Sequence, residues 1–269
     1  MDPNVAPPSK PTRIWPVVLV LLLLAGGGVV GWGVFLTPRG REAAVVVEDA
    51  GVAEVLDAGP SRSVDEGDAL LKQLAARWSA DAEYARWLDS LSLRHLVSAT
   101  LLVAEGNSPR PALPFLSLSA PFSVREEQGP PPPRKKKGPP PPREERLFIS
   151  AESTARYDVL VKVLGSVDAA AAGDAWARLE PYCDAAFGEI SRPGTRFRDT
   201  LTTAVKRVLA VQVPEGELEV VGRGGVYVFK DPALEARSAL DKQLLRMGAA
   251  NAKVLQEQLR VFAAHAHLE

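Results

Sequence analysis

The sequence has little of the chemistry that single residues most often reveal. It contains one cysteine in 269 residues, so no intramolecular disulfide framework is possible. That residue, Cys183, shares a helical spacing with Ala186, Phe187 and Ile190, which favours a small buried side chain over a nucleophile. The formal net charge is only −1, which argues against a general nucleic-acid-binding protein with a strong positive field.

The motifs of common enzyme classes are also absent from the sequence. There is no HExxH motif, no G-x-S-x-G elbow, no Walker loop and no Cys/His ligand cluster. His265 and His267 are two apart on a predicted helix and therefore point to different faces. We assign no catalytic, cofactor-binding or metal-binding residue and favour a protein that is not an enzyme. Acid–base chemistry by carboxylates that lie far apart in the sequence stays open as an alternative.

The sequence does contain one long run without charge, from Ile14 to Leu36. As a helix this run would measure about 34 Å, enough to cross a hydrocarbon core of about 30 Å. It is too long for the apolar region of a cleaved signal peptide, so we predict a transmembrane helix. Gly27 and Gly31 form a GxxxG spacing, which would allow a weak homodimer between two such helices.

The charges beside this run do not decide its orientation, because two basic residues precede it and two follow it, namely Lys10, Arg13, Arg39 and Arg41. A short N-terminal tail usually stays in the cytoplasm, and a long C-terminal domain is translocated largely regardless of charge. We therefore predict a cytoplasmic N-terminus and an extracytoplasmic soluble domain.

The remaining composition divides the chain into further segments. Residues 1–13 are rich in proline and predict a disordered tail, and residues 37–63 predict a flexible linker. Residues 64–269 are long enough for one domain with a real core. Their patterns predict a mainly α fold with two small β-hairpins and a disordered Pro/Lys-rich insertion at 126–146.

Hydrophobic spacing and caps locate these elements. Ser90 or Ser92 caps a helix that Gly106 ends, and Ser150 caps a helix that carries Tyr157 to Leu164, in which Asp158 can pair with Lys162. The other predicted elements are two short helices within 68–88, two helices or one kinked helix over 168–190, a helix around 197–208, a helix from Pro232 to about Met247, a last helix through 255–266, and hairpins of strands 122–125 with 146–149 and 218–221 with 226–229.

The insertion reads GPPPPRKKKGPPPPR from Gly129 to Arg143 and lies at the tip of the first predicted hairpin. Its proline residues favour polyproline II and remove backbone donors, so we expect it to project from the domain. Seven basic residues against four glutamates over 125–146 leave a charge of +3. Two interpretations stay open, a solvated spacer and a polybasic contact for an anionic surface through Arg134, Lys135, Lys136, Lys137 and Arg143.

Several segments together resemble one protein family. The run Lys230–Glu235, then Ser238, Lys242 and Leu244–Ala252, with weaker matches at 108–115, 156–158 and 197–201, is similar to the domain of unknown function 3014 family. The insertion and Thr200, where we expect an arginine, depart from that pattern. The resemblance implies an uncharacterised bacterial protein with one N-terminal span of the inner membrane, and it implies no activity or cofactor.

The polar residues among the matched segments form a candidate partner site or structural polar network, and they are Arg110, Arg156, Tyr157, Asp158, Arg246 and Asn251. From these features we expect a membrane-tethered interaction or scaffold domain with a protein partner in the bacterial envelope and no nucleic-acid partner. The alternatives are a binder of anionic lipid or cell-wall polymer through the Pro/Lys tract and an enzyme that uses non-local carboxylates.

Overall fold

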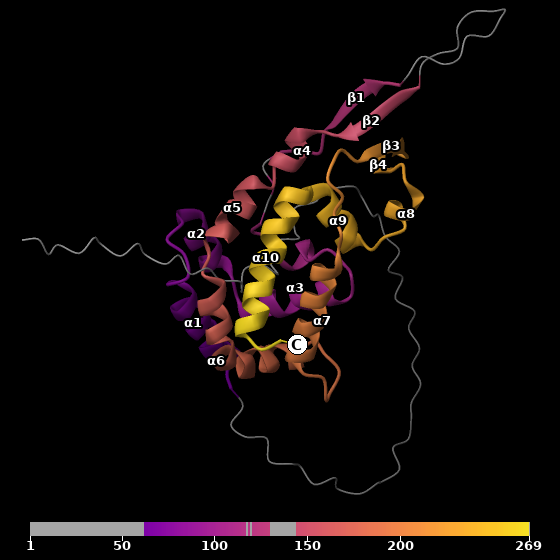
Figure 1. The fold of residues 1–269 in the computed structure, drawn as a ribbon. Helices are drawn as coiled ribbons and strands as arrows, with labels where there is room; N and C mark the ends of the chain where they lie inside the picture. The colour runs from indigo at the N-terminus through magenta and orange to yellow at the C-terminus, as the bar shows by residue number, and fades with distance from the viewer. Residues whose placement is uncertain (1–61, 117, 119, 130–143, 269) are drawn as a thin grey trace, which may run out of the picture.

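The computed structural model describes residues 62–116, 118, 120–129 and 144–268 (Figure 1). The predicted tail 1–13, the predicted transmembrane helix 14–36, and the predicted linker 37–63 up to residue 61 lie outside these described residues, as do residues 130–143 of the insertion. Within the described ranges, no helix is both long enough and apolar enough to cross a membrane.

The described part of the chain is mainly helical and carries one small antiparallel sheet. In chain order its elements are α1 (Val64–Ala75), α2 (Ala82–Ser90), α3 (Leu93–Ala104), η2 (Arg110–Ala112), β1 (Val124–Gln128), β2 (Glu145–Ile149), α4 (Ala151–Ala155), α5 (Asp158–Ser166), α6 (Ala169–Gly188), α7 (Phe197–Ala210), β3 (Glu219–Arg223), β4 (Val226–Phe229), α8 (Pro232–Glu235), α9 (Ala239–Met247) and α10 (Ala249–His265).

Side-chain caps fix where several helices begin. Ser92 accepts a hydrogen bond from the backbone N–H of His95, so it is Ser92 and not Ser90 that caps α3. Ser150 caps α4 in the same way. α6 continues through Pro181 as one helix, which decides between the two predicted arrangements.

Two predicted helices are each divided in the structure. The helix expected after Ser150 separates into α4 and α5 at Arg156 and Tyr157, where the backbone N–H of Tyr157 donates to Thr154 in a tighter turn. The helix expected from Pro232 to Met247 separates into α8 and α9, because Ser238 forms a new N-cap for α9. The predicted pair of Asp158 with Lys162 is also wrong, since Lys162 lies beside Asp81 (Nζ–Oδ2 3.4 Å).

The four strands pair in the order β1–β2–β3–β4. The two hairpins are correct, but they are not separate, because β2 pairs with β3 through Leu147 opposite Val220 and Phe148 opposite Glu219. The first hairpin is also longer than expected: residues 126–128 and 145–146, assigned to the disordered insertion, lie in β1 and β2. The ladder continues beyond the apolar residues that mark it in the sequence, with Glu127 opposite Arg146 and Gln128 opposite Glu145.

The turn of the second hairpin follows directly from its glycines. Gly224 and Gly225 have φ of +59° and +82°, the left-handed values that both central residues of a type I′ turn require. This turn matches the twist of β3 and β4.

The helices bury one large apolar core, and the sheet contributes a small one. α10 packs against α5, α6 and α7, and α3 packs against α6 and α7, so these helices form the helical body (Figure 1). Cys183 is fully buried there on α6, as its spacing predicts, and burial raises the pKa of its thiol. The sheet's own cluster contains Ile149, Val220, Phe229 and Leu245 of α9. β1 and β2 extend away from the helical body beyond α4 (Figure 1).

Candidate functional site

Four of the predicted polar residues meet where the sheet joins the helical body. Arg110 comes from η2, Arg156 and Tyr157 from the junction of α4 and α5, and Arg246 from the last turn of α9. The positive charges of all three arginines act on the Tyr157 hydroxyl. We call Arg110, Arg156 and Arg246 around Tyr157 the arginine cluster.

Tyr157 is the buried centre of this cluster. Its side chain is fully buried, and Arg156 Nη2 donates a hydrogen bond to its hydroxyl at 3.2 Å. Burial raises the pKa of the Tyr157 phenol, while the neighbouring charges of Arg156, Arg246 and Arg110 act in the opposite direction. The phenol is therefore a neutral hydrogen-bonding group in this site.

Arg156 is held between aromatic rings. Its guanidinium carbon lies 5.0 Å from the ring centre of Tyr157 and 5.4 Å from that of Phe122, which precedes β1. The residue is only 7% exposed, yet its buried Nε–H has no acceptor among the described residues. Buried donors of this kind are rare in folded proteins and require an explanation.

Arg246 of α9 contacts β4 of the sheet. Its Nη2 donates to the carbonyl of Tyr227 at 3.3 Å, and its guanidinium lies 5.2 Å from the ring centre of Phe229. Burial lowers the pKa of Arg246, and the charge of Arg156 acts in the same direction. The two arginines are therefore near enough to repel each other.

Glu235, the carboxylate that attracts Arg246, already accepts hydrogen bonds from other groups. Glu235 attracts Arg246, but it accepts hydrogen bonds from Lys242 Nζ at 2.8 Å and from the backbone N–H of Phe229 at 2.9 Å. Neither Arg156 nor Arg246 forms an ion pair with a carboxylate within the described ranges. Arg156 and Arg246 therefore carry positive charge that no carboxylate of the described residues neutralises through an ion pair.

Asp158 and Asn251, the other two predicted residues, form a separate contact. Asn251 Nδ2 donates to the Asp158 carboxylate at 3.1 Å and lies within 3.3 Å of the carbonyls of Thr154 and Met247. Gly248, with φ of +84°, lets the turn between α9 and α10 approach Thr154. This contact joins α4 and α5 to α9 and α10 and so supports the geometry of the arginine cluster.

A hollow of about 360 Å³ lies against one member of the cluster. Its lining consists of Arg110, Pro111, Leu113, Pro114 and Leu116, so it is apolar apart from the arginine. Beside the cluster, the rings of Phe122 and Tyr227 pack at 5.7 Å, and Tyr227 is 38% exposed. Apolar surface therefore accompanies the positive charge.

The predicted polybasic residues Arg134, Lys135, Lys136, Lys137 and Arg143 lie outside the described residues. The two ends of their segment are described: the backbone N–H of Gly129 donates to the carbonyl of Glu144 at 2.7 Å. Gly129 and Glu144, which flank residues 130–143, are thus held together where β1 and β2 extend from the helical body (Figure 1).

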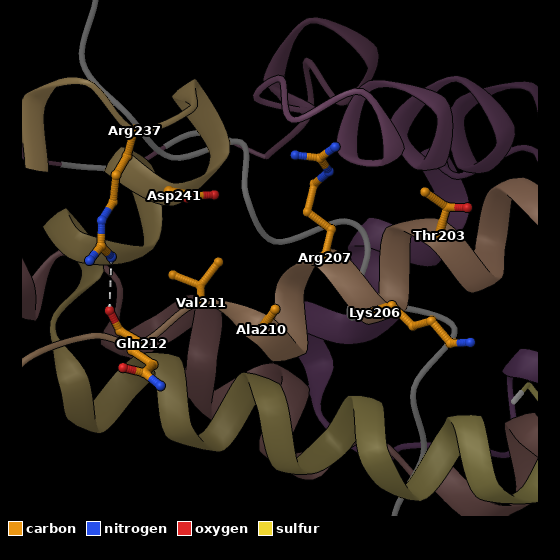
Figure 2. Close-up of a pocket in the computed structure, with 8 residues that line it drawn as sticks. All are labelled: Thr203, Lys206, Arg207, Ala210, Val211, Gln212, Arg237 and Asp241. Atoms are coloured by element: carbon orange, nitrogen blue, oxygen red, sulfur yellow. Dashed lines mark hydrogen bonds between the residues drawn. The ribbon is translucent and has the colours of Figure 1, made fainter. Parts of the chain in front are cut away.

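Sequence reasoning missed a second basic surface, a groove of about 570 Å³ at the end of α7. Figure 2 shows Arg207 of α7 and Arg237, between α8 and α9, on its walls, with the hydrogen bond from Arg237 to the Gln212 carbonyl (3.1 Å). The groove is lined by Thr203, Lys206, Arg207, Ala210, Val211, Gln212, Arg237 and Asp241. Adjacent Lys206 and Arg207 mark one wall in the sequence, but no local pattern brings Arg237 to them.

The aromatic partners of the arginine cluster were missed as well. β4 reads Val-Tyr-Val-Phe without a polar residue, so the sequence shows neither that Phe229 is the buried ring nor that Arg246 covers it. Within the described ranges, no three His, Cys, Asp or Glu side chains gather as metal ligands do. The cluster offers hydrogen-bond donors and positive charge, a combination that binds and orients an anion.

The family comparison covers both parts of this site. A family model described as "Protein of unknown function (DUF3014)" matches residues 92–263, which include the arginine cluster, the Asp158–Asn251 contact and the groove. No curated protein and no solved structure matches the chain.

Proposed function

The chain belongs to the DUF3014 family of proteins of unknown function, and we propose that it is a membrane-tethered interaction domain on the extracytoplasmic side of the bacterial inner membrane. The observation that carries the proposal is the positive charge of Arg156 and Arg246, which no carboxylate of the described residues pairs with. Charged side chains that are half or fully buried normally pair with a carboxylate, and Arg156 and Arg246 do not. A partner that supplies negative charge would complete the site.

The tether in this proposal comes from the sequence. The uncharged run 14–36 has the length of a membrane span, and residues 37–63 could reach about 90 Å when fully extended. A domain on such a linker can meet envelope proteins at a distance from the bilayer. A scaffold or adaptor role uses this arrangement without any chemistry by the domain itself.

Membrane topology is the first test of this proposal. Alkaline phosphatase fused after residue 269 is active only outside the cytoplasm, whereas green fluorescent protein exported unfolded is fluorescent only inside. We expect phosphatase activity without fluorescence. Fluorescence without phosphatase activity would place the domain in the cytoplasm and contradict the proposal.

Site-specific crosslinking tests the binding surface. A photoreactive amino acid at Tyr227, beside the arginine cluster, is expected to give a crosslinked partner in cells. That product should disappear in Arg246→Met, and the same probe at Ile190, 50% exposed at the end of α6, serves as the control. A product that forms equally well from both positions, or that survives Arg246→Met, would contradict a role for the cluster.

A second candidate function is supported by the hairpin tip. The bond between Gly129 and Glu144 holds both ends of the Pro/Lys tract at the part of β1 and β2 that extends from the helical body. Anionic lipid or cell-wall polymer would then be the partner. Deletion of 129–142 should weaken sedimentation with anionic liposomes at low salt, and unchanged sedimentation would end this alternative.

A further inference from the structure

We infer that the arginine cluster is a binding site for the carboxylate of an aspartate or glutamate in a peptide segment that carries an apolar side chain beside it. This inference deepens the proposed interaction function and rests on it, because it names the chemical group that the partner presents. Three features of the site support it: free hydrogen-bond donors, positive charge and neighbouring apolar surface.

Both Arg156 and Arg246 keep hydrogen-bond donors that are free to bind a ligand. Arg156 uses Nη2 on the Tyr157 hydroxyl, and its buried Nε–H has no acceptor among the described residues. Arg246 uses Nη2 on the Tyr227 carbonyl. Two neighbouring guanidinium groups, each with one donor engaged, can together satisfy the two oxygens of one carboxylate.

The charge of Arg156 and Arg246 limits the charge of the anion that can bind between them. A buried anion must offset its own desolvation, and that cost rises steeply with charge. Arg156 and Arg246 repel each other, and Glu235 already compensates Arg246 in part. A single negative charge between the two guanidinium groups removes the repulsion. A doubly charged phosphate would leave an excess of negative charge in the site, because Glu235 already offsets part of the charge of Arg246.

Apolar surface lies beside the arginine cluster. The hollow next to Arg110 is lined by Pro111, Leu113, Pro114 and Leu116, and the ring of Tyr227 is partly exposed. An acidic side chain with an apolar or aromatic neighbour would place its carboxylate between the arginines and its neighbour against these surfaces. Such a pairing of an anchor with an apolar contact is typical of peptide recognition.

The test compares two peptides on the full-length protein in detergent micelles. The probes are acetyl-Leu-Glu-Phe-amide and the same peptide with glutamine in place of glutamate, with binding measured by calorimetry at constant ionic strength. We expect the glutamate peptide to bind at least tenfold more tightly than the glutamine peptide. Equal binding of the two peptides, or binding of neither, both to the wild type and to the linker variant described below, would overturn the inference.

Variants connect this preference to the cluster. In Arg246→Met the preference for glutamate should fall below threefold, and in Arg246→Lys it should be intermediate, because lysine keeps the charge but loses the planar fork. Arg207→Met removes an arginine from the groove of Figure 2 and should change nothing. If Arg246→Met does not fold, Arg246→Lys carries the comparison, and an unchanged preference in that variant overturns the inference.

Two further arms distinguish the source of the anion. Inorganic phosphate that binds wild type more tightly than the glutamate peptide would overturn the choice of a carboxylate. The linker supplies five carboxylates of its own, so the peptides are also titrated into a variant with Glu42→Gln, Glu48→Gln, Asp49→Asn, Glu54→Gln and Asp57→Asn. A glutamate preference that emerges only in this variant supports the carboxylate site and identifies the linker as its occupant.

The outcome is separable from that of the proposed function. Crosslinking at Tyr227 that depends on Arg246 in cells, without any glutamate preference in vitro, would leave the interaction domain standing and refute only the carboxylate. A glutamate preference in a protein whose domain lies in the cytoplasm would support the carboxylate site and refute the extracytoplasmic location in the proposed function.

Discussion

The helical body and the sheet of this protein are stabilised by different forces. The body buries large apolar side chains such as Tyr84, Phe197 and Leu164, and its rings of Trp176, Phe187 and Phe197 pack against one another. Burial of this kind contributes about 1.5–3 kcal/mol for each large side chain and involves no ionised group.

The sheet has a small apolar cluster and many charged contacts. Arg146 forms two hydrogen bonds to the Glu219 carboxylate, at 2.9 and 3.0 Å, and also lies over the ring of Phe148. Lys230 Nζ donates to the same carboxylate at 2.7 Å, and Arg125 pairs with Glu217. Exposed ion pairs are individually weak and are screened by salt. We therefore expect the sheet to open before the helical body does.

The largest expected effect belongs to the core of the helical body. Phe197→Ala removes a fully buried ring that contacts Trp176 and Phe187, which should cost about 3–5 kcal/mol. Chemical denaturation followed by circular dichroism should show the loss in the unfolding of all helices together. Unchanged unfolding of the helices would show that the packing around Phe197 does not stabilise the helical body.

The matched substitution in the sheet sharpens the comparison. Phe229→Ala removes an equally buried ring from the small cluster of the sheet, and the expected cost is about 3 kcal/mol, at the lower end for phenylalanine. Native-state hydrogen exchange should show faster exchange in β2, β3 and β4 and unchanged exchange in α6 and α10. Equal acceleration in α6 would show that the sheet does not open separately.

A close approach within the helical body gives the next effect. A Cβ at Gly173 of α6 would lie 2.4 Å from the Cβ of His265 and 2.9 Å from the Phe262 carbonyl of α10. Gly173→Ala should force the helices apart and cost about 1–3 kcal/mol, seen as a lower denaturation midpoint. Gly188→Ala in the same helix is the control, since a Cβ there meets nothing within 4 Å and should stabilise by about 0.4–1 kcal/mol.

The smallest effect concerns the charges of the sheet. Hydrogen bonds from Arg146 and Lys230 lower the pKa of Glu219 from 4.5 to about 2. Because the folded pKa is the lower one, this contribution is complete above pH 4.5 and is lost as the pH falls toward 2. Glu219→Gln should therefore cost no more than about 1 kcal/mol at pH 7.

Exchange measurements on the sheet amides between pH 5 and 2 check this sign. Protection in β2 and β3, compared with that in α10, should decrease with acid in wild type and change less in Glu219→Gln. An identical acid dependence in both proteins would show that Glu219 does not link the sheet to pH.

Much of the helical body could be predicted from local pattern. The Ser92 and Ser150 caps, the buried position of Cys183 and the glycine turn of the second hairpin each depend on residues close in the sequence. The predictions failed where a distant partner competed with a local one. Lys162 lies beside Asp81 instead of Asp158, and Asp158 is held by Asn251.

The candidate site was predictable only as a set of residues. The resemblance placed Arg156, Tyr157 and Arg246 in one set of candidate residues. It could not show that Arg156 donates to the Tyr157 hydroxyl, that the charge of Arg246 also acts on this group, or that Asp158 instead accepts from Asn251. The aromatic rings that cover the arginines belong to strands, and their contact depends on how the sheet docks on the helices.

The sequence by itself determined the mainly α character of the domain, the positions of most helix starts and the two hairpins, because caps, turns and apolar stripes act over a few residues. Only the tertiary structure decided that the hairpins join through Leu147 and Val220, and that the charges of Arg110, Arg156 and Arg246 all act on Tyr157. Those contacts link segments from 46 to 136 residues apart, and their geometry depends on the packing of the whole core.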